Sequence, residues 1–295
     1  MKKILLAGIM LLTALMASAQ IKVAPKMQKG DKKVYVTETT TTIAGQKSIT
    51  MTVETQYAVT DVTPDGYVLN VTVTDVQTDA DKNDLTGRII SLSQEMLKGI
   101  NTSLSTDKDG KVMGILNYQE VKNNREQFID KILEEVPATP ALSKDVLKEK
   151  LLDQLSEESL LKSMQISSSP LTLNGKTITN GMQDEFLNLE GLRMKRTYAV
   201  TQDNTIETTS AINLSNEEMK QFVIALVEKL MPGQADMVRQ NIDTIISTGM
   251  LKLKIDEKDV YTLQADGWVS GITSNTICDT MGQKTTVSGV VRLKQ

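Results

Sequence analysis

Alternation of apolar and polar residues predicts β-structure in the N-terminal part of the chain. Over residues 49–59 the apolar side chains fall on odd positions with Thr, Glu and Gln between them, and residues 67–73 repeat the pattern. A period of two is that of a strand with one buried face. Turn-forming residues at 44–47 and 64–66 separate the runs. The sequence therefore predicts a three-stranded antiparallel meander over residues 31–79.

The middle of the chain changes to a helical period. Apolar residues recur at every third or fourth position over residues 119–164, with Lys and Glu on the other face and interruptions at Pro137 and Pro140. That spacing is typical of amphipathic helices. Alternation returns over residues 171–214, which we predict as a second β stretch.

A helix pair and a last group of strands complete the predicted elements. The helix pair covers residues 215–247, and Ser215 and Glu218 have the spacing of a capping box at its start. A C-terminal meander is predicted over residues 249–294. Together the elements predict a single α+β domain over residues 20–295. It would consist of a large curved antiparallel sheet, with meanders at both ends of the chain and helices packed on one face.

The first residues predict export. A pair of lysines, an apolar run and three small residues open the chain, which is the pattern of a signal peptide over residues 1–19, cleaved between Ala19 and Gln20. The apolar run, 4–16, is shorter than the roughly 20 residues that span a bilayer, and we expect no transmembrane segment. After cleavage the first residue would be Gln20 and not the cysteine that receives a lipid anchor. We therefore expect a soluble periplasmic or secreted protein without a lipid anchor.

Composition excludes several kinds of chemistry. The chain has no histidine, which excludes Ser–His–Asp and Cys–His catalysis and His-ligated zinc. Its single cysteine excludes an internal disulfide. Loss of two lysines with the signal peptide leaves 31 basic residues of 33 against 37 acidic ones, a poor balance for binding nucleic acid. We expect no enzymatic activity, cofactor or metal, although a hydrolase built on carboxylates that converge across the sheet stays open.

Aliphatic and methionine side chains are the candidate lining of a binding surface, because methionine adapts to irregular apolar ligands. Met51 lies in the first meander, and Met219, Phe222 and Leu226 lie in the helix that follows Ser215. We predict a periplasmic or secreted binding protein that holds an apolar or lipid-like ligand between sheet and helices. Ordinary core packing of the same residues is the simpler interpretation.

A second interpretation is a structural module of the envelope that has no pocket and binds a protein partner. It would act through an exposed strand edge, where unpaired backbone groups can accept another strand. The Thr-rich run 37–42 is the candidate edge.

Several short stretches carry a family resemblance: Lys29-Gly30-Asp31-Lys32, Gly45-Gln46-Lys47, and the stretches 271–275 and 281–284. With the signal peptide they resemble an uncharacterised family of secreted Bacteroidetes proteins, a domain of unknown function. The resemblance implies an envelope or extracellular location and supplies no catalytic residues. The order of elements is also loosely similar to the lipoprotein-carrier fold, in which a curved antiparallel sheet cradles a lipid under helices.

Two triplets resemble the Asp-Thr/Ser-apolar signal for protein O-glycosylation in the envelope of these bacteria. They place candidate glycosylation sites at Thr244 and Thr280. Thr280 lies beside a predicted turn and is the better candidate of the two.

Overall fold

The fold was analysed in a computed structural model of the chain. The structure describes residues 20–83, 85–135, 144–153, 155–166, 168–188, 191–201, 204–212, 214–230, 235–247, 253–280 and 283–294. The predicted signal peptide, residues 1–19, lies outside the described residues and stays a prediction.

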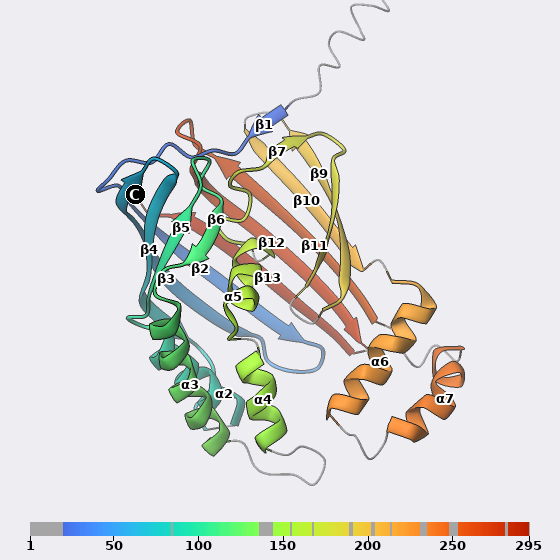
Figure 1. Ribbon diagram of the computed structural model, residues 1–295. Helices are drawn as coiled ribbons and strands as arrows, with labels where there is room; N and C mark the ends of the chain where they lie inside the picture. The colour runs from blue at the N-terminus through green and yellow to red at the C-terminus, as the bar shows by residue number, and fades with distance from the viewer. Residues whose placement is uncertain are drawn as a thin grey trace, which may run out of the picture.

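One antiparallel sheet of eleven strands dominates the structure, in the order β6-β5-β4-β3-β2-β13-β12-β11-β10-β9-β8 (Figure 1). A separate pair, β1 with β7, lies at one end of this sheet. The strands are β1 Gln20–Lys22, β2 Lys32–Ile43, β3 Ile49–Thr63, β4 Gly66–Thr78, β5 Asn101–Thr106, β6 Val112–Ile115, β7 Thr177–Thr179, β8 Gln183–Leu187, β9 Arg193–Thr201, β10 Thr205–Ile212, β11 Leu253–Leu263, β12 Val269–Thr280 and β13 Gln283–Leu293.

Both predicted meanders are present, and they join into one sheet. β2, β3 and β4 form the first meander and β11, β12 and β13 the second. The strands β2 and β13 connect them, with Tyr35 opposite Leu293 and Thr41 opposite Val287. The prediction that the run 37–42 forms an exposed edge is therefore wrong. These threonines pair with β3 on one side and with β13 on the other, because the first and last long strands of the chain meet at the centre.

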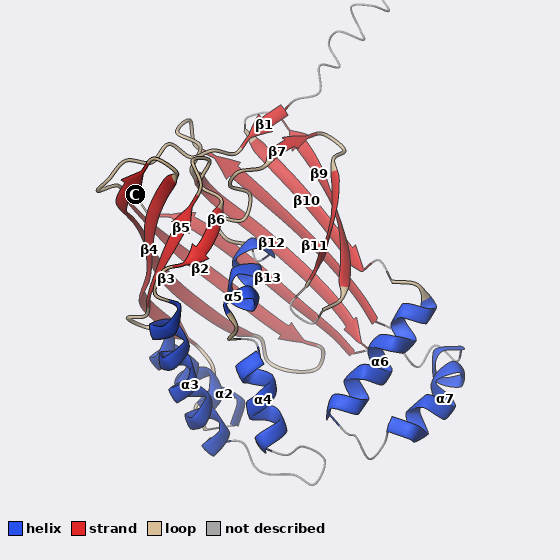
Figure 2. Cartoon of the chain, viewed as in Figure 1, coloured by secondary structure: helices blue, strands red, loops and turns tan. Residues whose placement is uncertain are grey.

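The helices lie mainly at the margins of the sheet (Figure 2). They are α2 Leu85–Leu97, α3 Tyr118–Glu135, α4 Lys144–Asp153, α5 Glu157–Ile166, α6 Asn216–Leu230 and α7 Ala235–Ser247. Packing of helices on strands is concentrated at one edge, where α2 contacts β4, α3 contacts β5 and α5 contacts β6. The fold is α+β as predicted, but the helices do not spread over a whole face of the sheet.

Local signals placed α6 correctly, whereas one β boundary was wrong. The Ser215 hydroxyl accepts a hydrogen bond from the Glu218 backbone N–H, and the Glu218 carboxylate accepts one from the Ser215 N–H, so the capping box forms. The second β stretch begins at Thr177 and not at residue 171. Residues 170–175 are turns that end at Gly175, whose φ of 78° favours glycine.

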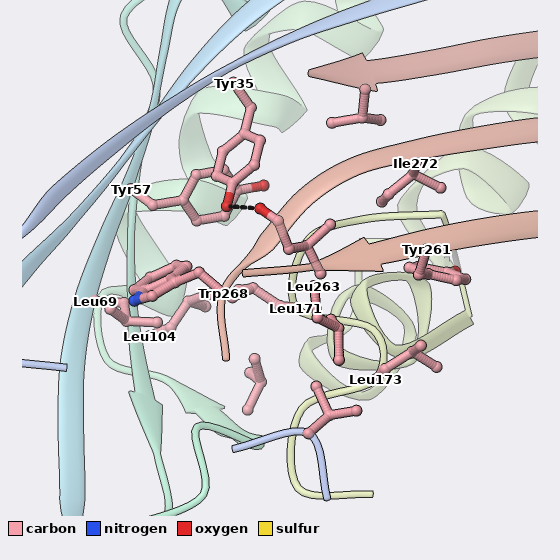
Figure 3. Packing of buried hydrophobic residues seen from close by; sticks show 14 of the residues in the cluster. Tyr35, Tyr57, Leu69, Leu104, Leu171, Leu173, Tyr261, Leu263, Trp268 and Ile272 are labelled. Atoms are coloured by element: carbon pink, nitrogen blue, oxygen red, sulfur yellow. Dashed lines mark hydrogen bonds between the residues drawn. The ribbon is translucent and has the colours of Figure 1, made fainter. Parts of the chain in front are cut away.

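The main core fills one part of the inner face of the sheet (Figure 3). Trp268 belongs to this core, together with apolar residues of the sheet such as Leu69 and Leu104 and with Leu171 and Leu173 of the 168–176 segment. The Tyr35 hydroxyl donates to the Val269 carbonyl at 2.7 Å, and the Tyr35 and Tyr57 rings meet edge to face with centroids 5.4 Å apart. The 168–176 segment, with β1 and β7, thus covers the inner face where helices do not.

Candidate functional site

The inner face continues beyond the core as a surface of half-exposed side chains, which we call the open floor. Directly paired residues of antiparallel strands share a face, so the pairing of Thr37 with Val53 and with the core residue Val291 identifies this side of the sheet. The open floor consists of Thr39, Thr41, Ile49, Met51, Ile255, Thr276, Cys278, Thr285, Val287 and Gly289, each half-buried.

The opposite face of the same strands has a different chemistry. Charged residues alternate with the floor residues and form ion pairs there, such as Lys294 with Glu54 at 2.6 Å and Lys254 with Asp256 at 2.6 Å. The ten floor residues carry no charge, and Glu257 is a charged residue that lies on the same face, opposite Thr276. In the described part of the chain, the central strands make their extensive contacts with one another and not with a helix. Among the described residues, the open floor is thus a largely apolar and hydroxyl-bearing surface on which no helix packs extensively.

The predicted lining residues lie in different places. Met51 belongs to the open floor. Met219 lines a depression of about 360 Å³ at the start of α6, together with Ile212 and Ile255. Phe222 is half-buried on α6, which packs on α7, and the side chain of Leu226 lies outside the described residues. The structure therefore does not join Met51 and Met219 in one pocket.

A second hollow, which we call the edge cleft, lies between the two margins of the sheet. It has a volume of about 320 Å³ and takes its lining from β6, α5, the 168–176 segment, β8 and β9. Within its lining, Lys176 Nζ lies 2.9 Å from Asp184 Oδ2 and donates to the Tyr198 hydroxyl at 2.7 Å. Tyr198 in turn donates to Asp184 Oδ2 at 2.7 Å. Lysine, tyrosine and aspartate thus form one closed hydrogen-bonded group.

Sequence analysis missed this group. Its members lie on β8, on β9 and just before β7. The pairing of β8 with β9 brings Asp184 close to Tyr198, and the contact of β7 with β9 adds Lys176. An aspartate within an alternating strand was the available signal, but it does not identify its partners.

Hydrogen bonding controls the ionisation of Asp184. Burial raises the pKa of this carboxyl, but hydrogen bonds from Lys176 and Tyr198 and the nearby positive charges outweigh burial, and the pKa lies below its ordinary value of 3.8. A carboxyl with a lowered pKa in the folded state stabilises the fold above its unfolded pKa. That contribution is lost as the pH falls through the folded pKa.

We expect Asp184→Asn to lower the free energy of unfolding by about 1–3 kcal/mol at neutral pH, because Lys176 would lose its charged partner. The difference from the unchanged protein should shrink as the pH falls below about 4. Urea unfolding at several pH values measures it. Asp65→Asn, in an exposed turn, is the control and should change little. A loss of stability that is independent of pH would contradict the assignment.

A buried carboxylate fastens the 168–176 segment to the sheet. Asp259 on β11 is 3% exposed, and it accepts hydrogen bonds from Ser168 at 3.0 Å and from Thr208 at 3.5 Å. Ser168 also lies 3.3 Å from the Ser274 hydroxyl on β12. Three strands are therefore connected to the segment that covers the core.

The described residues also bear on metal binding, on membrane spanning and on the candidate glycosylation sites. Among the described residues, no group of three or more Cys, Asp or Glu side chains is arranged to hold a metal ion. No described helix has the length and apolar character needed to cross a membrane. Thr244 is exposed on α7, and Thr280 is the last residue of β12, with its side chain outside the described residues. Glycosylation at either position stays a prediction.

No family model and no curated protein matches this chain. Among solved structures, it is similar to a lipovitellin studied for its lipid–protein interactions, with 8% identity and a TM-score of 0.40. That match covers 92% of this chain and 26% of the lipovitellin chain, so this chain spans about a quarter of its length. A porin-like protein from Bacteroides uniformis ATCC 8492 matches with 10% identity and a TM-score of 0.20, over 92% of this chain and 98% of that one.

Both TM-scores are low, so the function proposed below rests on the structure of this chain alone. A Bacteroides protein is among these neighbours. Membership of the uncharacterised Bacteroidetes family stays a prediction.

Proposed function

We propose that this protein is a non-enzymatic, exported binding protein that holds an apolar, lipid-like ligand on the open floor. The observation that supports the proposal is the asymmetry of the central strands. Half-exposed aliphatic and threonine side chains predominate on one face, while ion pairs such as Lys294–Glu54 and Lys254–Asp256 lie on the other. Burial of apolar surface is favourable by about 25 cal/mol per Å², so such a floor gains free energy when an apolar molecule covers it.

The dimensions of the floor suit an acyl chain. A strand rises about 3.3 Å per residue, so residues 37–43 extend over about 20 Å, which is comparable to an extended long acyl chain. The sheet is curved around this face (Figure 1), which lets side chains of several strands contact one ligand. Met51 on the floor has the flexible thioether that adapts to such a molecule.

A pair of adjacent substitutions tests the proposal. Gly289 lies on the floor, where an added Cβ would meet nothing closer than Ser274 Cβ at 3.7 Å. Gly289→Phe should therefore place a ring over the floor without disturbing the backbone. Ser288→Phe places the same ring on the opposite, exposed face and is the matched control.

The measurement is native mass spectrometry of residues 20–295 purified from their own envelope, before and after solvent extraction. We expect an extractable apolar adduct on the unchanged protein and on Ser288→Phe, and at least about a tenfold lower occupancy on Gly289→Phe, equivalent to about 1.4 kcal/mol. A bare protein, or equal occupancy in both variants, would overturn the proposal.

A bare protein would favour the alternative of an interaction module. Its candidate edge, the run 37–42, is internal to the sheet. The margin at β6 is also shielded, because Glu157 of α5 accepts a hydrogen bond from the Ile115 N–H at 3.3 Å. A side chain that occupies an outer backbone donor hinders the addition of another strand.

A further inference from the structure

The lining of the edge cleft combines apolar side chains with charged ones. Val112 of β6, Met164 of α5, Leu171 and Phe186 of β8 supply apolar side chains to its lining. Ligand sites in proteins are commonly hollows of roughly 300 Å³ or more, with apolar walls and a few placed polar groups. The volume of about 320 Å³ and the lining fit that description.

Basic groups exceed acidic ones around this hollow. Lys111, Lys176 and Arg196 line it, against Asp184 and Glu185, which leaves one positive charge in excess. Two of these groups are already engaged with each other, because Lys176 and Asp184 form an ion pair at 2.9 Å. Arg196 is 2% exposed, so its positive charge acts at low dielectric. There its electrostatic attraction for an anion is stronger than it would be in water.

Lys111 is an exposed member of the cleft lining. It makes no ion pair with any residue that the structure describes. Its side chain lies beside Gly175, where an added Cβ would come within 2.8 Å of Lys111 Cβ. Lys176 directly follows Gly175 in the chain. The ammonium groups of Lys111 and Lys176 therefore come from neighbouring positions of the lining.

A row of apolar residues leads from the cleft to the open floor. Phe186 in the cleft pairs with Met194, and Met194 pairs with Ile212. Ile212 and Ile255 line one depression, and Ile255 pairs with Cys278 of the floor. The cleft and the floor are thus connected on one face of the sheet by uncharged residues, of which Met194 is buried.

We propose that the edge cleft binds the acidic head group of the ligand, so that the ligand is an anionic amphiphile with a carboxylate or phosphate head. This inference rests on the proposed function, since it assigns the apolar part of the same molecule to the open floor. Lys111 and Lys176 contact the head group, and Arg196 adds its positive field from the interior.

Palmitic acid and hexadecanol are the probes, because they share a chain length and differ in charge. Each probe is titrated, from the same detergent micelles at neutral pH, into the delipidated protein, residues 20–295. Native mass spectrometry then measures how much of it is bound. We expect the acid to bind several-fold more tightly than the alcohol, with a preference that falls at high salt. Lys111→Gln should lower the affinity for the acid by about fivefold, which corresponds to about 1 kcal/mol, and leave the affinity for the alcohol unchanged. Lys108→Gln, an exposed lysine of the same hairpin, should change neither.

The outcomes separate the two proposals. Equal affinity for acid and alcohol, without an effect of salt or of Lys111→Gln, would overturn the anionic head group and leave the binding function in place. Binding of neither probe would count against the proposed function itself. A phosphate head is distinguished by titrating lysophosphatidic acid, which should compete with palmitic acid if both use the cleft. If it does not compete while palmitic acid keeps its preference, the head group is restricted to a carboxylate.

Discussion

We expect Trp268→Ala to lower the free energy of unfolding by about 3–5 kcal/mol, the usual cost of removing a buried large aromatic side chain. Trp268 is 2% exposed and belongs to the main core. Its indole N–H donates to the Lys26 carbonyl at 3.2 Å, and Lys33 Nζ stands 5.8 Å from the ring centroid. The ring therefore ties the N-terminal entry of the chain to the hairpin between β11 and β12.

Urea unfolding followed by far-ultraviolet circular dichroism measures this loss, because the chain has no second tryptophan to report by fluorescence. Val62→Ala is the control, since Val62 is 48% exposed and its truncation should change stability by less than about 0.5 kcal/mol. A loss below about 1 kcal/mol for Trp268→Ala would mean that the core packs without this ring.

Local pattern was sufficient to predict most individual elements. The alternation at 49–59, together with the turn at 64–66, predicted β3 and β4 because each strand has one face on the core and one in solvent. Helix α6 followed from its capping box, which is a signal contained within four residues. Such features depend on neighbours in the sequence and are visible there.

Long-range pairing was not visible in the sequence. Nothing in the run 37–42 distinguishes a central strand from an edge, since threonine suits both, and only the pairing with β13 decides. The Lys176–Asp184–Tyr198 group was missed for the same reason, because strand register brings its members together.

The candidate lining was only partly recoverable from sequence. Alternation placed Met51 on the face of the sheet that carries the core, but it could not show where the core ends and the open floor begins. That boundary is set by the 168–176 segment, whose Ser168 is held by Asp259. Turn-rich segments of this kind carry no period from which their position can be predicted.

The ion-pair chemistry of the inner face leads to a second large expected effect. We expect Arg196→Met to lower the free energy of unfolding by about 3 kcal/mol. The change removes one charge from a buried cluster of charged side chains and leaves the other charges in place. Arg196 Nε donates to the Ser210 hydroxyl at 3.2 Å, and its guanidinium carbon lies 4.3 Å from the centroid of the Phe186 ring. Methionine keeps much of the aliphatic length, so the change chiefly removes charge and donors.

Lys195→Met is the matched control, because Lys195 is the preceding residue of β9 and is exposed on the opposite face. It should change stability by less than about 0.5 kcal/mol. Combination with Asp184→Asn tests whether the two charges act together, since Asp184 is the strand partner of Arg196. The double variant should lose less than the sum of the single losses. Strict additivity would mean that Arg196 stabilises the inner face through packing and Ser210 alone, and that the positive field assigned to the edge cleft does not reach Asp184.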